Sequence, residues 1–494
     1  MSLSRRQFLQ SSGAALGMAM FLGHLPAPLQ AQSAPSSFSP QHHWLNRLTW
    51  GVRPADLARL NELGASAFLE EQLDYQNLAD PVVEQFISGR RILSMRYAEL
   101  QAYSGDPTPI ILQTLEARLF RAVYSQRQLY ERMVEFWTDH FNIPIPDYAD
   151  VRMLDERDAI RPHALGTFRD LLFASAQSPA MLFYLNNASS DAEHPNENYA
   201  RELLELHTLG VDGGYNEADV IDLARVLTGW TVRDGAFTFN PEKHDYGAKR
   251  VLGIDLPEGR GMEEGLQMLD VLARHPSTAR FISFKLCRRF VSDVPPQDLV
   301  AQVAEVFSAT EGDLKSVLRA IFASEAFAQA GGQKFRRPLE WLVAALRALS
   351  EGISIGNYRP LLEALDEMGQ LPFHWHPPNG YPDVGMAWLN TNGLLHRWNV
   401  ALALGLAGEA YLEGTALNLV PFGDVAGISA EDLLDTASQA LLSVRLEGEQ
   451  RETLLAYLTD GQGDPALPLL EAVRPVKVAG LVGLLLASPV FQWH

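Results

Sequence analysis

A short acidic and aromatic stretch, residues 135–141, holds side chains that could carry out acid–base chemistry. Asp139 and His140 are neighbours in it, and Trp137 precedes them. Carboxyl and imidazole groups can transfer protons in an active site, and an aromatic ring beside them offers a flat apolar surface to a sugar. We therefore take Asp139 and His140 as candidate catalytic residues and Trp137 as a candidate binding residue.

The same stretch also fits a purely structural interpretation. Glu131, Glu135 and Asp139 are spaced four apart, and on a helix that spacing places them in one stripe. A row of acids usually lies on a solvated helix face. The residue types alone leave both interpretations open.

A second charged stripe lies on a helix that is predicted to begin at Asn196. Glu197, Arg201 and Glu205 follow at intervals of four, which gives an acid–base–acid row on one face. Such a row can be a pair of surface ion contacts, each contributing little stability. In the alternative, Arg201 orients a carboxylate in a cleft, Asn196 and Asn198 add hydrogen bonds, and Glu197 and Glu205 are candidate catalytic acids.

Other polar candidates lie in turn-like contexts. His163 follows Pro162, His244 precedes Asp245, and Trp230 ends a Thr-Gly-Trp motif. We take His163, Trp230, His244 and Asp245 as further candidate binding residues, although a lone histidine in such a context more often has a structural role.

The same histidines and carboxylates are also common metal ligands. Glu205 and His207 are two residues apart and point away from each other on a helix, whereas Glu202 and Glu205 could share one ion. A di-iron helical bundle needs two Glu-x-x-His pairs, and the sequence contains none. A His-Glu-x-x-His motif is also missing from the sequence. The residues therefore assign neither metal ligands nor a cofactor.

Helices must position these side chains, because apolar residues recur at helical spacing through most of the chain. The pattern predicts a mainly α, multi-helix globular protein with a small β-hairpin or short sheet inserted. Predicted helices span residues 54–73 with a break at Gly64, 110–124, 128–141, 168–185, 196–209, 216–229, 263–273, 277–291, 299–307, 314–322, 338–349, 361–368 and 386 to the end.

The clearest β signal lies near residues 231–254. Residues 231–233 and 236–239 flank Asp234-Gly235, a pair that favours a two-residue hairpin turn. Residues 250–254 form a predicted third strand. A loop rich in proline, histidine and aromatic residues spans 369–382.

The N-terminus has the pattern of an export signal. Arg5 and Arg6 precede a modest apolar stretch, residues 13–25, and a small-residue site ends at Ala31. This is typical of a twin-arginine signal peptide, and the stretch is shorter than the roughly 20 apolar residues of a membrane span. We expect a signal peptide at 1–31, a flexible leader at 32–40, and one helical domain at 41–494, in one or two lobes. The expected location is periplasmic or extracellular, with no stable membrane span in the mature chain.

The net charge limits which partners the protein can bind, and the cysteine content limits which disulfides it can form. The formal charge is −20, and loss of Arg5 and Arg6 with the signal peptide makes it −22. Such a surface repels phosphate backbones, so nucleic acid and anionic lipid are poor partners. Cys287 is the only cysteine, so no disulfide can form within the chain.

Short blocks along the chain carry a family resemblance. They are residues 43–51, 136–137 with 140–141, 161–166, 196–210, 227–230, 244–249, 337–340 and 486–492. Together these blocks resemble the bacterial domain of unknown function 1800 family from about His43 to Gln492. The family typically has His-Asn where this chain has Thr138-Asp139, which argues against a mechanism that needs a histidine at 138. The resemblance implies export, a helical fold and frequent gene pairing with a sulfatase-like family; it implies no established reaction.

Our leading hypothesis is an exported hydrolase that acts on a polymeric, carbohydrate-like substrate. Asp139 and either Glu197 or Glu205 would form an acid–base carboxylate pair, as glycoside hydrolysis requires. The aromatic surface would come from Trp137, Trp230 and Trp375.

Two alternatives come from other classes. A metal or redox cofactor protein is suggested by His140, His163, His207 and His244 together with export in the folded state. A non-catalytic partner of a sulfatase-like exported protein would need only helical lobes and an acidic surface.

Overall fold

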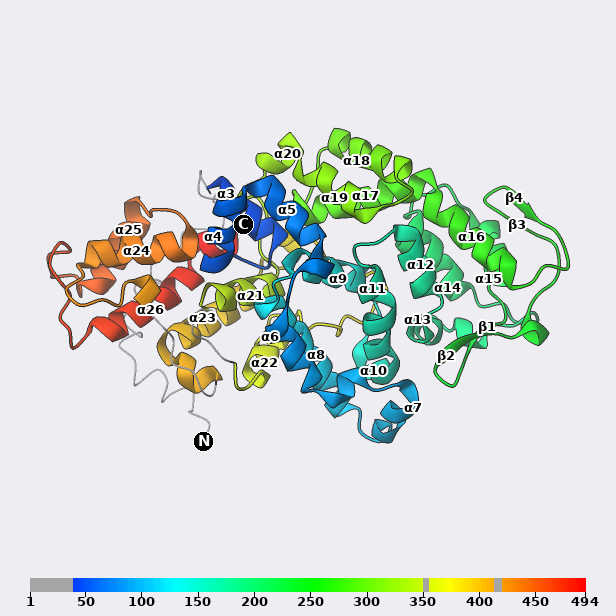
Figure 1. Ribbon diagram of the computed structural model, residues 1–494, viewed down its shortest axis with the longest axis horizontal. Coiled ribbons are helices and arrows are strands. Elements are labelled where there is room, and N and C mark those ends of the chain that lie inside the picture. The colour runs from blue at the N-terminus through cyan, green and yellow to red at the C-terminus, as the bar shows by residue number, and fades with distance from the viewer. Residues whose placement is uncertain (1–38, 350–354, 413–419) are drawn as a thin grey trace.

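A computed structural model describes residues 39–349, 355–412 and 420–494. The predicted signal peptide and most of the predicted leader lie outside the described residues. Pro40, the last residue of that leader, begins the first described helix. The described chain is mainly α-helical with two small antiparallel sheets of two strands each, which confirms the predicted fold class (Figure 1).

The first half of the chain is built from short and medium helices. They are α3 (Pro40–Leu48), α4 (Pro54–Leu63), α5 (Ala65–Leu73), α6 (Pro81–Ser88), α7 (Tyr97–Leu100), α8 (Thr108–Tyr124), α9 (Gln128–His140), α10 (Ile145–Leu154), α11 (Arg161–His163), α12 (Phe168–Ala176), α13 (Pro179–Tyr184), α14 (Glu197–Glu202) and α15 (Glu217–Val226). Two π-helical turns extend α10 and α14, namely η4 (Asp155–Ile160) and η6 (Leu203–Thr208). A π-turn adds a residue to the helical turn and often occurs at functional sites.

The second half continues with helices of similar length. They are α16 (Met262–Arg274), α17 (Pro276–Phe290), α18 (Gln297–Ala309), α19 (Leu314–Phe322), α20 (Glu325–Ala328), α21 (Pro338–Ala348), α22 (Arg359–Glu367), α23 (Thr391–Leu412), α24 (Ala430–Leu442), α25 (Gly448–Leu458) and α26 (Arg474–Ala487). Short 3₁₀ turns complete the description: η1 (Tyr75–Asn77), η2 (Arg91–Ser94), η3 (Gln101–Tyr103), η5 (Asn187–Ser189), η7 (Pro241–Lys243), η8 (Gly385–Ala387), η9 (Val420–Phe422) and η10 (Val490–Gln492).

The N-terminal cap of α15 is the one that the sequence predicts. Asn216 Oδ1 accepts hydrogen bonds from the backbone nitrogens of Ala218 and Asp219, at 2.9 and 3.4 Å. The Asp219 carboxylate in turn accepts one from the backbone nitrogen of Asn216, at 2.9 Å. This reciprocal pair satisfies amide groups that the first helical turn leaves without a partner.

The structure confirms the predicted hairpin, but the predicted third strand, residues 250–254, is wrong. β1 (Trp230–Arg233) pairs with β2 (Ala236–Phe239) across Asp234-Gly235, whose φ angles are 52° and 73°. The chain at 249–256 instead forms its own hairpin from β3 (Lys249–Val251) and β4 (Ile254–Leu256). Leu252 and Gly253 also have positive φ, at 51° and 78°, so a second two-residue turn folds this segment back on itself.

The described part of the chain after Met386 is largely helical, as predicted, but it is divided into several helices. A 3₁₀ turn, η8, comes first, and α23 to α26 are separate helices. Between α25 and α26 the chain turns at Asp460 and Gly461, both with positive φ. Apolar periodicity cannot distinguish one long helix from several short ones when the turn residues between them are few.

Buried apolar side chains form two large clusters. The first is built mainly on α3, α5, α9 and α12 to α20, and the second on α8, α10 and α21 to α26. Figure 1 shows α9 near the middle of an elongated molecule, with β3 and β4 at one end and α24 to α26 at the other. Arg132 of α9 contacts Glu340 of α21 at 3.1 Å, and this contact links the two clusters.

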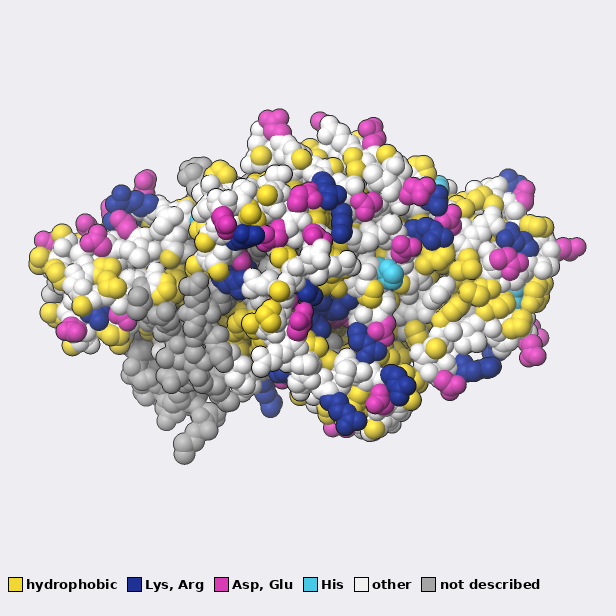
Figure 2. All heavy atoms as spheres, in the orientation of Figure 1, with side chains coloured by type: hydrophobic (Ala, Val, Ile, Leu, Met, Phe, Trp, Pro, Cys, Tyr) yellow, Lys and Arg dark blue, Asp and Glu magenta, His cyan; other side chains and the backbone are white. Residues whose placement is uncertain are grey.

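The visible surface carries both signs of charge. Figure 2 shows acidic and basic side chains interspersed with apolar ones over this face, without a large region of one sign. Within the described ranges, none of the helices is both long enough and apolar enough to cross a bilayer.

Candidate functional site

The acidic stripe of α9 is buried. Glu131 and Glu135 have 4% and 5% of their surface exposed, so the stripe does not face water as acid rows usually do. Each acid meets arginines from other helices, because α9 lies between the two apolar clusters and has protein on every side. A buried carboxylate is tolerated only when it is paired and hydrogen-bonded.

The first buried ion network lies around Glu131. Arg161 donates to both oxygens of Glu131, at 2.9 and 2.8 Å, and its Nε donates to Glu156 at 2.8 Å. Arg118 lies 3.1 Å from the other oxygen of Glu156. Burial raises the pKa of Glu156, but Arg118 and Arg161 outweigh it and hold that pKa at about 2. The π-turn η4 places Glu156 there, so this network serves to fix the packing of α8, α9 and α11.

The second network lies around Arg337, at the start of α21. Its Nη2 is 3.0 Å from Glu135 and 3.2 Å from Glu340, and its Nη1 is 3.4 Å from Asp139. Arg289 of α17 contacts Glu135 at 2.9 Å. One guanidinium can serve three carboxyl groups because it has five N–H donors in a fixed plane.

Asp139 is the acid at the open end of this network. Its side chain is 16% exposed, whereas that of Glu135 is 7% exposed. Burial, and then the charge of Glu135 one helical turn away, raise the pKa of Asp139 well above its usual value, and Arg337 only partly opposes them. The pKa of Glu135 is raised as well, by burial. Two carboxyl groups this close share a proton, and Asp139 is the member that solvent can reach.

A second partly exposed acid, Asp383, lies beside the same guanidinium. Its carboxylate is 2.9 Å from Nε of Arg289 and 3.9 Å from Nε of Arg337, and its side chain is 18% exposed. The charge of Asp383 contributes to the raised pKa of Asp139. The site therefore holds two partly exposed acids beside the same guanidinium: Asp139, whose pKa is raised, and Asp383, which contacts Arg289 and Arg337.

The loop at 369–382 packs on the end of α9. A Cβ placed on Gly380 would lie 2.1 Å from the carbonyl oxygen of Asp139, and Gly380 has φ of +71°, so only glycine fits. Asn142 donates to the carbonyls of Trp375 and Pro377, both at 2.7 Å. The half-buried Trp375 ring lies 5.1 Å from that of Tyr381, and the charge of Asp139 contributes to the raised pKa of Tyr381.

His140 and Lys285 form a contact on the other side of Asp139. His140 Nε2 lies 3.0 Å from the carbonyl of His207, which can only accept, so Nε2 carries the proton. Lys285 Nζ is 2.8 Å from Nδ1 of the same ring. Burial, and then the charge of Lys285, hold the pKa of His140 well below its usual value, so the ring is neutral. The free lone pair of Nδ1 accepts the hydrogen bond from Lys285.

The structure places Glu197 and Arg201 in a surface ion cluster. Arg201 lies 3.1 Å from Glu197 and 2.6 Å from Glu217, with side-chain exposures of 38%, 44% and 63%. Hydrogen bonds to Glu217 raise the pKa of Arg201. This is the plain surface interpretation of the stripe, and among the described residues no contact joins it to Asp139.

Glu205 lies nearer to the site but has a different partner. The hydroxyl of Tyr215 donates to Glu205 at 3.3 Å. Burial and the charge of Glu205 raise the pKa of Glu202, so these two acids form a small pair of their own. η6 carries both Glu205 and His207, whose carbonyl His140 contacts.

Asn196 and Asn198 have local structural contacts. Asn196 caps α14, since its Oδ1 accepts from the backbone nitrogen of Asn198 at 2.9 Å. The Asn198 side chain donates to the Leu185 carbonyl at 3.4 Å. His163 ends the short α11 and is partly exposed.

Two of the three tryptophans proposed as stacking surface are core residues. Trp137 and Trp230 are fully buried, and Trp137 Nε1 donates to the Ala164 carbonyl at 3.0 Å. Neither ring has a face open to a sugar. Trp375, the third, is the one that is partly exposed.

His244 is the centre of a buried ion triad. Its Nδ1 is 2.8 Å from the Thr228 carbonyl and its Nε2 is 3.2 Å from Glu264, while Lys249 lies 2.7 Å from the same Glu264 oxygen. Both ring nitrogens face acceptors, and although burial lowers the pKa of His244, the hydrogen bond that its ring donates to Glu264 gives a net rise. Asp245 is paired with Arg225 at 2.7 Å. These contacts hold β3 and the segment before it against α15 and α16.

Sequence reasoning missed Arg337, Asp383 and Lys285. The signal for Arg337 was present, because Arg337-Pro338-x-Glu340 is a helix start in which Glu340 accepts from the Arg337 backbone nitrogen at 3.0 Å. Lys285 and His140 are 145 positions apart, and no local pattern links them.

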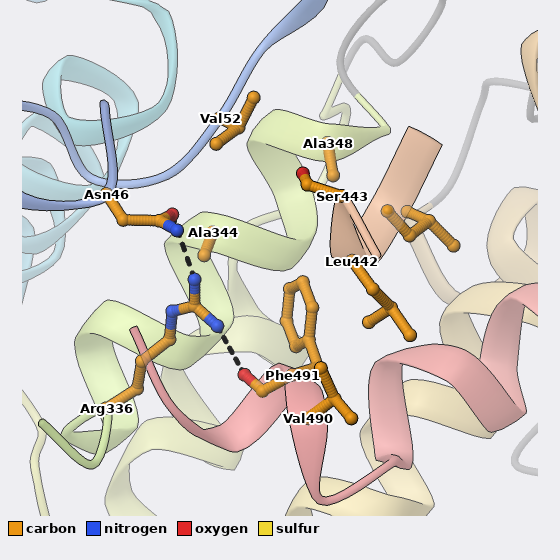
Figure 3. A pocket seen from close by; sticks show the side chains of 10 residues that line it. Asn46, Val52, Arg336, Ala344, Ala348, Leu442, Ser443, Val490 and Phe491 are labelled. Carbon is orange, nitrogen blue, oxygen red and sulfur yellow. Dashed lines mark hydrogen bonds between the residues drawn. The ribbon is translucent and has the colours of Figure 1, made fainter. Parts of the chain in front are cut away.

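The rest of the described chain offers little for binding a metal or a small ligand. Among the described residues, no three His, Cys, Asp or Glu side chains gather as a metal would need. A pocket lies elsewhere, where Arg336 is held between Asn46 Oδ1 and the carbonyl of Phe491 (Figure 3). Ala344, Ala348 and Leu442 are among its apolar lining, and no acid, histidine or cysteine lines it. The two hydrogen bonds of Arg336 link α3 and the C-terminal segment to the start of α21.

Fold and site together define a mainly α-helical protein with a buried ion network that opens to solvent at Asp139 and Asp383. A family model described as "Protein of unknown function (DUF1800)" matches residues 43–493, and the chain belongs to this family. Neither a curated protein nor a solved structure matches the chain.

Proposed function

We propose that the protein is a hydrolase that uses Asp139 as a general acid and Asp383 as the accompanying carboxylate. The observation that carries this proposal is the raised pKa of Asp139, caused by burial and by the neighbouring Glu135. A carboxyl group that keeps its proton near neutral pH can protonate a leaving oxygen, whereas an ordinary aspartate cannot. Asp383 replaces Glu197 and Glu205 as the partner, because it lies beside the same Arg337.

The expected chemistry is cleavage of a glycosidic bond in a carbohydrate polymer. Asp139 would give its proton to the oxygen that leaves, and Asp383 would act on the opposite side of the sugar as base or nucleophile. Trp375 and Tyr381 support a sugar substrate because the charge of Asp139 acts on Tyr381, and the partly exposed Trp375 ring packs against Tyr381, where a sugar ring could stack.

The test is hydrolysis of a panel of polysaccharides and aryl glycosides by wild-type protein and by Asp139→Asn. Loss of a general acid lowers kcat by about 10²–10⁴-fold. Aryl glycosides with an acidic leaving group, such as 2,4-dinitrophenol, need little protonation, so Asp139→Asn should keep most of its rate on them. The wild-type rate should fall as pH rises through the raised pKa of Asp139, since the protonated form is the active one.

The matched control is Asp147→Asn. Asp147 is 62% exposed, and its nearest partner is the exposed His376 at 4.0 Å, so this variant should match wild type on every substrate. Equal loss on activated and unactivated substrates in Asp139→Asn would contradict an acid role. Absence of any hydrolysis by the wild-type protein across the panel would refute the proposal as a whole.

We also propose that the protein works outside the cytoplasm after twin-arginine export. This rests on Arg5 and Arg6 and on the small-residue site at Ala31. A lone buried Cys287 is compatible with an oxidising compartment because it offers no disulfide partner.

A further inference from the structure

We propose that Lys285 is a nucleophilic amine that condenses with an aldehyde or ketone to form a Schiff base. This goes beyond hydrolysis, in which Lys285 has no assigned role; it rests on the contact of Lys285 with His140 and shares only the Asp139 proton with the proposed function. Lysine amines act this way when they are neutral, partly accessible and held next to a proton donor.

The contacts of Lys285 favour the neutral amine. Its Nζ donates to Nδ1 of His140, a neutral ring whose other nitrogen is committed to the His207 carbonyl. Within the described residues no carboxylate lies within ion-pair distance of Nζ, so its positive charge is not neutralised by a direct partner. Burial lowers the pKa of Lys285 to about 8, and the charges of Asp383 and Asp139 only partly oppose the change. The side chain is nevertheless partly exposed.

The other lysines show how unusual this setting is. Only six of the 40 basic residues are lysines. Lys249, Lys334 and Lys477 are each paired with a carboxylate, from Glu264, Asp293 and Asp460 respectively. Lys243 and Lys315 complete the set; Lys243 is exposed and Lys315 partly exposed. Arginine fills most buried cation positions, so a lysine at 285 is a distinct choice, since only lysine can lose its proton and attack carbon.

The site also holds the proton that the reaction consumes. The lone pair of Nζ forms a bond to the carbonyl carbon, and the carbonyl oxygen takes the proton of Asp139. One nitrogen-bound proton then passes through His140 to the new hydroxyl, and the C–O bond breaks as water leaves. The product is a protonated imine with Asp139 as its carboxylate counter-ion, so atoms and charge balance.

The test is reductive trapping on the wild-type protein. Glycolaldehyde and cyanoborohydride are added at pH 7, and the rate of labelling at each lysine is followed by peptide mapping with mass spectrometry. We expect Lys285 to be labelled at least about tenfold faster than Lys243 and Lys315, because more of it is neutral. Its labelling rate should level off above about pH 8, while those of the two controls continue to rise.

Lys285→Arg is the matched variant, since it keeps the charge but cannot form an imine. Labelling at position 285 should disappear, while labelling at Lys243 and Lys315 stays the same. Labelling of Lys285 that is slower than that of both controls at pH 7, or that rises with them above pH 8, would overturn the proposal. Hydrolysis is not measured in this experiment, so its outcome is separate from that of the proposed function.

Discussion

In this protein, a single arginine often pairs with two or three buried acids. Arg337 contacts Glu135, Asp139 and Glu340, and Arg161 contacts Glu131 and Glu156. A buried carboxylate loses most of its hydration, and an adjacent guanidinium offsets that loss only if it supplies several donors in the right plane. The arrangement gives Asp139 only a 3.4 Å contact with Arg337, and burial and the charge of Glu135 raise its pKa well above the usual value.

Replacing Arg337 by methionine should destabilise the protein strongly. The change keeps apolar length but leaves Glu135 and Glu340 buried without this partner, and breaking a buried ion pair on one side costs about 3–5 kcal/mol. Urea denaturation followed by circular dichroism measures the free energy of unfolding.

Arg359→Met is the control for that experiment. Arg359 pairs with Glu363 at 2.8 Å one turn along α22, with both side chains more than half exposed. Exposed pairs of this kind contribute little, so this variant should unfold almost as wild type does. An equal loss in both variants would show that the buried network contributes nothing special.

At the residue scale, the sequence could predict the acid stripe but not its environment. The spacing of Glu131, Glu135 and Asp139 placed them on one face of a helix, and that is where they lie. Whether the face around Glu135 meets water or arginines depends on α17 and α21; Arg289 of α17 lies 154 positions from Glu135 in the chain. Local patterns do not encode such long-range pairing, so Arg289, Arg337 and Lys285 were not found.

At the element scale, the loop at 369–382 decides how Asp139 is presented. It runs from α22 toward α23 and covers the C-terminal end of α9, with Tyr381 donating to the Leu371 carbonyl at 2.6 Å to close the loop on itself. Asn142 stabilises the loop by donating hydrogen bonds to two of its backbone carbonyls. The close approach at Gly380 shows that the loop and the helix end fit together with no space between them.

Replacing Gly380 by alanine should therefore displace the loop. The new Cβ would overlap the Asp139 carbonyl oxygen at 2.1 Å, and the left-handed backbone adds strain. We expect a lower Tm and, if Asp139 is the general acid, a fall in kcat. Differential scanning calorimetry and the hydrolysis assay measure the two effects.

Gly461→Ala separates backbone strain from the clash. Gly461 has φ of +72°, almost the same as Gly380, but nothing lies within 4 Å of an added Cβ. It should cost about 1 kcal/mol from the backbone alone. If Gly380→Ala were no more harmful than Gly461→Ala, the close packing of the loop on α9 would be wrong.

Sequence patterns worked best for elements that carry their own signals. Asp234-Gly235 predicted the first hairpin and Asn216 with Asp219 predicted the start of α15, because turn and cap chemistry is local. The π-turns η4 and η6 were not predicted. They add one residue to a helical turn without a distinctive composition, and they set the positions of Glu156 and His207.

At the scale of the whole molecule, the ion networks lie where two apolar clusters meet. α9 and α17 belong to the first cluster and α21 to the second, so Glu135, Arg289 and Arg337 bridge them. Paired charges at such a boundary require a specific alignment, since a shifted contact would leave a charge buried alone. The apolar clusters supply most of the stability, and the charges fix how the clusters meet.

The chain as a whole should reach its place of action already folded. No disulfide stabilises it, since Cys287 is the only cysteine, and the buried networks form without a change of redox compartment. In a bacterial host with twin-arginine transport, we expect the mature protein to begin near Gln32, as measured by N-terminal sequencing and intact mass.

Lysine in place of both Arg5 and Arg6 should keep the full-length chain in the cytoplasm, whereas Arg96→Lys, a change at a side chain 87% exposed, should leave export unchanged. A wild-type protein that still begins at Met1 in the periplasm, or export that persists with both lysines, would contradict the twin-arginine route. The folded domain described above would be unaffected by that result, because its first helix begins only at Pro40.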